Sequence, residues 1–254
     1  MSRNTSYKED VVWSAIVVRS AVFAALVLAA TMISVYTPIT EGYFNLGESM
    51  VYTAAILGGP YVGLIAGGIG SALADIILGY SHYAPGTLVI KAIEGYLAGW
   101  IFLRLSRLPG GKRRSMIYIS AILVGGGIAL AGAFLYAGLY GGSTELSIWG
   151  KTVTFTIPLG AWLLVGALIA VVILYIGTRR DELLGVATVS MLLAGLEMVA
   201  GYFIYEATVI YSLGLGEMTN PLAAAAEIPV NLGQVIVGAA IASIVVSSVW
   251  RAQR

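Results

Sequence analysis

The sequence predicts an all-α fold, a polytopic bundle of transmembrane helices. Of its 254 residues, 59% are hydrophobic and only 11% are charged. A soluble domain of this size carries roughly a quarter charged residues, so most side chains of this chain do not face water. The apolar residues also form long runs, the first from about Val12 to Val35. This run exceeds the apolar core of a signal peptide, about 7–15 residues, and is interpreted as an uncleaved first helix.

The apolar runs predict eight helices in succession. A helix needs roughly 20 apolar residues to cross about 30 Å of hydrocarbon. The candidate spans are about 12–35, 48–58, 60–79, 86–104, 115–140, 157–177, 183–206 and 226–249. The second is short for a span, so its inclusion depends on the charges between the helices.

Basic residues occupy alternate connections between these spans. They gather at the start, around 104–114, at 179–180 and at the end, whereas the intervening loops carry almost none, Lys151 excepted. With eight spans every basic cluster falls on one side of the membrane, and with seven a cluster would lie outside. The positive-inside rule then places both the N and C termini in the cytoplasm.

Several functional classes are excluded by composition. The net charge of +1 gives no basic surface for nucleic acid. The chain has no cysteine and one histidine, so a thiolate or histidine-built metal site is not expected. No zinc-binding helix, serine elbow or multi-aspartate motif is present, so we expect neither an enzyme nor a cofactor.

Polar side chains inside the predicted spans mark a candidate site. An ionisable group at the bilayer centre costs roughly 2.5–3.5 kcal/mol, so each one is a functional hypothesis. The ionisable residues that we single out within or at the start of the spans are Glu48, Asp75, Lys91, Glu94, Glu197, Glu206 and Glu227. Lys91 and Glu94 are three residues apart on one helix and can pair, with a structural ion pair as the alternative to a site.

The last predicted helix carries Glu227, Asn231 and Gln234 at i, i+4 and i+7. This spacing places the three side chains on one helical face. Three hydrogen-bonding groups on one face of a membrane helix favour a polar cavity, although bonds between helices are an alternative.

Aromatic residues gather in the outer loops and helix ends, among them Tyr43 and Tyr202. Most are interpreted as an interfacial aromatic belt, while a few could stack on a planar ligand. His82 lies in a short outer loop, either as a surface residue or as a gate or ligand contact.

Small residues recur at every fourth position of several spans. The third span has Gly59, Gly63 and Gly67, followed by Ser71 and Asp75. The first span has Ala21, Ala25 and Ala29, on a helix expected at the edge of the bundle. Such stripes either pack helices against each other or face a partner subunit, and the alanine stripe is the candidate for the second role.

Four segments carry a resemblance to a known family. These are 43–63 (YFNLGESMVYTAAILGGPYVG), 67–75 (GGIGSALAD), 83–95 (YAPGTLVIKAIEG) and 228–238 (IPVNLGQVIVG). Together they resemble the substrate-binding S components of energy-coupling factor (ECF) vitamin transporters. The resemblance covers about 12–104 and 183–249.

The family resemblance implies a single transmembrane domain with a six-helix core, about 1–104 and 183–254. Two further helices, about 115–177, are then inserted after the fourth helix. Because the insertion is even-numbered, it preserves the orientation of the helices that follow.

The resemblance also implies a function. S components bind a small water-soluble vitamin or precursor from outside and join a transmembrane coupling subunit and two ATP-binding subunits. This implies a multi-pass protein of a prokaryotic plasma membrane, with riboflavin, pyridoxine or a pyrimidine as compatible cargo. The alternative is a self-sufficient, proton-coupled secondary transporter, with Glu197 or Glu94 carrying protons.

By position, the resemblance selects candidate residues for two roles. Ala21 and Ala25 correspond to positions that commonly meet the coupling subunit. The candidate substrate-binding residues are Tyr43, Asn45, His82, Lys91, Glu94, Tyr202, Glu206, Glu227, Asn231 and Gln234.

Overall fold

The computed structural model describes residues 2–37, 42–132, 143–148, 151–156, 159–177, 182–215, 224–225 and 227–253. Its helices are α1 (Ser2–Thr31), α2 (Gly47–Gly58), α3 (Pro60–Leu78), α4 (Ala84–Ser106), α5 (Gly110–Gly132), α6 (Leu159–Gly177), α7 (Glu182–Tyr205) and α8 (Ile228–Ala252). Each predicted span corresponds to one of these helices. The predicted all-α, polytopic helical bundle is confirmed.

Five helical segments among the described residues are long and apolar enough to cross a membrane. They are Trp13–Thr31, Pro60–Leu78, Gly110–Leu130, Glu182–Ile210 and Ile228–Ala252. Of the others, α2 has only 12 residues, and α6 has a shorter apolar stretch, Gly160–Tyr175. The chain is therefore a multi-pass membrane protein.

Proline and glycine set several helix boundaries. A proline occupies the first turn of α3, α4 and α8, where its missing N–H has no helical partner to lose. Gly59, between α2 and α3, and Gly79, after α3, have φ angles of 91° and 92°. These angles are costly for any residue with a Cβ, so glycine permits the short α2–α3 connection.

Two small antiparallel hairpins accompany the helices. Strands β1 (Ser34–Thr37) and β2 (Gly42–Asn45) pair with Val35 opposite Phe44. Strands β3 (Ser143–Ile148) and β4 (Lys151–Thr156) pair with Leu146 opposite Val153. The sequence predicts that the first helix extends to Val35, whereas α1 ends at Thr31 and β1 begins at Ser34. Elsewhere in both regions it predicts only loops, because the strands are too short to give a clear alternating pattern.

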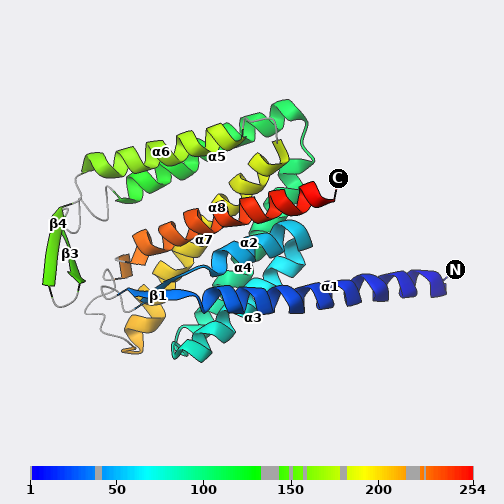
Figure 1. The fold of residues 1–254 in the computed structure, drawn as a ribbon, viewed down its shortest axis with the longest axis horizontal. Helices are drawn as coiled ribbons and strands as arrows, with labels where there is room; N and C mark the ends of the chain where they lie inside the picture. The colour runs from blue at the N-terminus through cyan, green and yellow to red at the C-terminus, as the bar shows by residue number, and fades with distance from the viewer. Residues whose placement is uncertain are drawn as a thin grey trace.

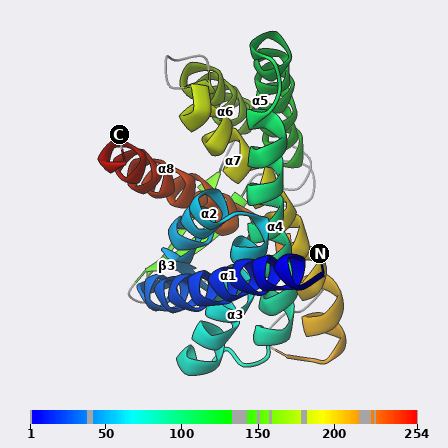
Figure 2. The same ribbon diagram turned by 90° about the vertical axis from the view of Figure 1, so that its right-hand side faces the viewer.

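The helices form two groups. Helices α1, α2, α3, α4, α7 and α8 pack together, with α2 in contact with α1, α3, α4 and α8. Helices α5 and α6 pack chiefly against each other along one edge of the molecule and reach the rest mainly through α7 (Figures 1 and 2).

Glycines allow α3 and α4 to approach closely. A Cβ on Gly63 would lie 2.5 Å from the carbonyl oxygen of Gly95, and one on Gly67 would lie 2.6 Å from the carbonyl oxygen of Lys91. The glycine stripe of α3 therefore packs against α4 inside the bundle. The alanine stripe of α1 differs, because Ala21 and Ala25 are both exposed.

Both chain ends lie toward the same end of the bundle, opposite the two hairpins (Figure 1). The salt bridge between Arg113 of α5 and Glu182 of α7 joins the starts of two helices that run in the same direction. The arrangement agrees with the alternation of basic connections in the sequence. The placement of the chain ends in the cytoplasm stays a prediction of the positive-inside rule.

Candidate functional site

A polar cavity of about 50 Å³ lies at the hairpin end of the bundle. Strand β2 and helices α2, α3, α4, α7 and α8 contribute to its wall, together with the π-helix η2 (Glu206–Ile210) that continues α7. The lining residues are Tyr43, Asn45, Glu48, Asp75, Tyr80, Tyr83, Thr87, Lys91, Tyr202, Glu206, Glu227, Asn231 and Gln234. Such a concentration of polar groups within an apolar bundle identifies a candidate binding site.

Amide groups of α8 hold strand β2 over one side of the cavity. The side-chain oxygen of Gln234 accepts hydrogen bonds from the backbone N–H of Asn45, at 2.9 Å, and from its side-chain amide, at 2.5 Å. The Gln234 amide nitrogen donates to Asn231 Oδ1 at 3.0 Å. The expected polar face of the last helix is therefore buried and connected to the hairpin.

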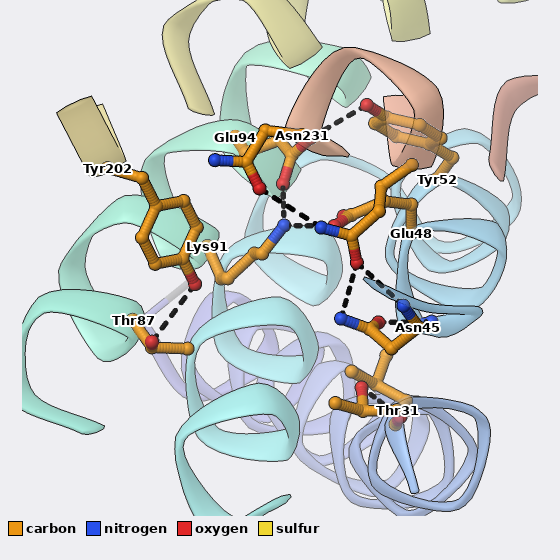
Figure 3. Close-up of polar contacts among 12 residues, drawn as sticks. Thr31, Asn45, Glu48, Tyr52, Thr87, Lys91, Glu94, Tyr202 and Asn231 are labelled. Carbon is orange, nitrogen blue, oxygen red and sulfur yellow. Dashed lines mark hydrogen bonds and ion pairs between the residues drawn. The ribbon is translucent and has the colours of Figure 1, made fainter. Parts of the chain in front are cut away.

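A buried ion cluster centres on Lys91 (Figure 3). Its ammonium group pairs with Glu48 of α2 and, at 3.0 Å, with Glu94 one turn away on α4. The hydroxyl of Tyr52 donates to the other Glu94 oxygen at 2.7 Å. One lysine thus serves two carboxylates, which compensates their burial and fixes the ammonium group in place.

Helix packing explains why Glu48 reaches this cluster. A Cβ on Gly238 of α8 would collide with the Cβ of Glu48, so α8 lies directly against the start of α2. This contact leaves Glu48 only 1% exposed and turned toward α4. The sequence alone does not show that α2 and α4 meet here.

Tyr43 connects the hairpin to α3. Its hydroxyl donates a hydrogen bond to Asp75, and its ring lies 4.8 Å from the ring of Tyr80, measured between centroids. Burial, followed by the negative charge of Asp75, raises the pKa of Tyr43 above its ordinary value. The phenol therefore stays protonated at neutral pH and keeps donating to Asp75.

Tyr83 plays a similar part next to α7 and α8. Burial raises the pKa of this phenol, and the charges of Glu206 and Glu227 raise it further. Tyr83 also shares a hydrogen bond with Glu206. The Tyr83 phenol therefore lies close to two carboxyl groups, one from η2 and one from the start of α8.

Tyr202 contributes both a ring and a hydroxyl. Its hydroxyl donates to Thr87 Oγ1 at 2.9 Å, and Lys91 Nζ lies 5.5 Å from its ring centroid (Figure 3). The ring therefore borders the ion cluster and offers a flat surface on which a planar ligand can stack.

The structure brings together all but two of the predicted binding residues. Glu94 lies beneath the cavity, where it anchors Lys91, and is fully buried. His82 lies beside the cavity, where its ring contacts Tyr83 and its carbonyl accepts a hydrogen bond from Tyr205. Substrate contact by the remaining residues stays a prediction.

Sequence reasoning does not select five of the lining residues, namely Glu48, Asp75, Tyr80, Tyr83 and Thr87. Glu48 and Asp75 are recognisable as ionisable residues of the spans, which is the signal available for them. Tyr80 and Tyr83 are indistinguishable in sequence from members of the aromatic belt. Thr87 gives no signal, because threonine is common in membrane helices.

No group of three or more His, Asp or Glu side chains within the described part of the chain could hold a metal ion. Fold and cavity together define a class, a membrane-embedded protein with a polar binding cavity at one end of its helical bundle.

Sequence comparison identifies the family. The profile of the family described as "ECF-type riboflavin transporter, S component" matches residues 14–161, more than half of the chain. The chain belongs to this family of S components, and the resemblance carried by its sequence segments is confirmed. It is therefore the S component of an ECF-type transporter.

Two curated proteins are similar to parts of the chain. An uncharacterised protein of Pyrococcus woesei is 38% identical over 117 residues, covering 42% of this chain and 78% of that protein. The thiamine precursor transporter HmpT of Lactococcus lactis is 34% identical over 92 residues, covering 34% of this chain and 53% of HmpT. No solved structure matches the chain.

Proposed function

We propose that this protein captures a small water-soluble vitamin or precursor from outside the cell for an ATP-driven ECF importer. The observation that carries the proposal is the polar cavity at the end of the bundle opposite both termini. By the positive-inside rule, this end faces the exterior of a prokaryotic plasma membrane. Riboflavin, pyridoxine and pyrimidine compounds are candidate cargo, and the similarity to HmpT supports a thiamine precursor.

The hairpin β1–β2 serves as the cover of the cavity in this proposal. Two of its side chains are tied to different helices, Tyr43 to Asp75 of α3 and Asn45 to Gln234 of α8. Breaking these bonds would open the cavity without unfolding a helix, so the hairpin can admit and retain a ligand.

The partners we propose are a transmembrane coupling subunit and two ATP-binding subunits. The exposed alanines Ala21 and Ala25 provide a surface of small side chains on α1, where another helix can approach closely. Replacing both with leucine is expected to prevent assembly with the coupling subunit while leaving ligand binding intact. Co-purification of the subunits, with Ala15→Leu at an exposed position of α1 outside this stripe as a control, measures this effect.

Helices α5 and α6 are proposed to be an addition to a six-helix core. Their packing, chiefly against each other and against α7, supports this division. The family match extends past residue 104 to 161 and so does not by itself separate the core from the addition.

The binding role is tested on the detergent-purified protein. We expect one ligand per chain without ATP, detected by calorimetry, and the same compound in mass spectra of the purified protein. Silence across flavins, B6 vitamers and thiamine precursors would contradict the proposal. Uptake by the protein alone in liposomes, driven by a pH gradient, would instead support the secondary transporter.

A further inference from the structure

Acidic side chains outnumber basic ones in the wall of the cavity. Four carboxylates line it, those of Glu48, Asp75, Glu206 and Glu227. Among the described residues, Lys91 is the only basic side chain in that wall. A ligand therefore enters a site with an excess of acidic side chains, inside a bundle whose apolar surroundings screen charge poorly.

Lys91 does not provide a positive charge for the ligand. Its ammonium group is held between Glu48 and Glu94, and both acids are buried. A third, anionic partner would have to compete with two carboxylates that are already in contact. Phosphorylated and carboxylate ligands are therefore disfavoured.

Glu206, unlike Lys91, has no oppositely charged partner among the described residues. It is only 2% exposed, and its Oε2 atom has no hydrogen-bond partner among the described residues. It forms no salt bridge within the described part of the chain, while Tyr83 and the Glu227 carboxylate lie close by. A buried carboxylate in this setting is stabilised most by a donor that also carries positive charge.

A second buried oxygen supports the same ligand chemistry. Glu48 Oε2 also has no hydrogen-bond partner among the described residues, since Lys91 bonds to the other oxygen. The ring of Tyr202 also borders the cavity. The wall thus offers acceptors at separate places and an aromatic face.

We infer that the ligand is a small, cationic nitrogen heterocycle whose positively charged N–H group donates to Glu206. Its ring stacks on a tyrosine, and a second donor reaches Glu48. The inference rests on the proposed function and narrows it, because it disfavours neutral flavins as well as anionic vitamins.

The test compares ligands that differ by one group, titrated into the purified full-length protein. Pyridoxamine and pyridoxine differ by an ammonium in place of a hydroxyl. A 5-aminomethylpyrimidine and its 5-hydroxymethyl counterpart differ in the same way, and riboflavin and nicotinate represent neutral and anionic ligands. We expect the amino member of the preferred pair to bind at least about 10-fold more tightly than its partner, the worth of one charged hydrogen bond.

The Glu206→Gln variant tests the proposed contact between the charged N–H group of the ligand and Glu206. It preserves shape and removes the carboxylate, so the two ligands of the pair should bind the variant with about equal affinity. Glu182→Gln, at the other end of α7, serves as the control and should keep the full preference. The inference is overturned if riboflavin or nicotinate binds most tightly, or if Glu206→Gln leaves the preference unchanged. Silence of every ligand would count against the proposed function itself.

Discussion

The α5–α6 pair and the other six helices pack through the same kind of glycine contact but differ in whether they contribute to the cavity. In the pair, Gly125 and Gly166 bring the two backbones together, as Gly63 and Gly95 do for α3 and α4. No described residue of α5 or α6 lines the cavity, whereas α2, α3, α4, α7 and α8 each contribute to it. Glycine contacts therefore bring helices together in both regions, and the polar residues that line the cavity come from only one of them.

The exposed fractions of the side chains also differ between the α5–α6 pair and the helices around the cavity. Leu123 of α5 and Leu164 of α6 are 61% and 72% exposed, as expected for side chains that face lipid. Around the cavity, Glu48, Lys91 and Glu94 are all nearly or fully buried. Changes in the ion cluster of Glu48, Lys91 and Glu94 should therefore affect stability and binding together, and changes in the pair should affect neither strongly.

The largest effect is expected for Lys91→Met. The substitution leaves the carboxylates of Glu48 and Glu94 buried without their shared cation, which costs about 3–5 kcal/mol. Thermal unfolding in detergent should show a much lower midpoint, and ligand binding should be lost. Lys112→Met, an exposed position at the start of α5, is the control and should behave like the wild type.

A smaller loss is expected for Gly63→Ala. The added methyl group meets the Gly95 carbonyl, and forcing α3 away from α4 costs about 1–3 kcal/mol. Gly126→Ala in α5 is the matched control, because a Cβ at this position would meet no heavy atom within 4 Å. Equal thermal midpoints for the two variants would show that the α3–α4 approach is not close.

Gln234→Leu should act on binding more than on the fold. It removes the acceptor of two Asn45 donors and so loosens the hairpin cover. We expect ligand affinity to fall about 10-fold, mostly through faster release. Stopped-flow dissociation measures the release rate, with the exposed Gln253→Leu as the control. An unchanged rate would mean that the hairpin does not retain the ligand.

The smallest effect is expected for Arg113→Ala. Its salt bridge to Glu182 is partly exposed to solvent, so its loss costs at most about 1 kcal/mol. Ligand affinity should not change, because the bridge lies at the end of the bundle away from the cavity. A drop in affinity measured by calorimetry would show that the α5–α6 pair is coupled to the site.

The sequence predicts the helices well because lipid imposes a strong pattern. Apolar length and alternating basic connections are sufficient to place all eight helices in order, even the short α2. The hairpins escape prediction because four- and six-residue strands give little periodic signal.

The site is only partly predictable for a different reason. Asn231 and Gln234 share a helical face, so local spacing is enough to group them. Glu48 meets Lys91 through contacts between helices far apart in the chain, and spacing carries no information about such contacts. His82 is grouped with the site by sequence position, yet its ring turns to Tyr83 beside the cavity.

The wide turn of η2 makes the cavity sensitive to chain length as well as to residue type. A π-helical turn accommodates an additional residue, so the chain after Glu206 is rotated by about 100° relative to an uninterrupted α-helix. Deleting Ala207 would retain every lining side chain, yet it would change the direction in which the chain departs toward α8. Related proteins could thus diversify their ligands through a single-codon insertion or deletion, a route that a scan of substitutions would never sample.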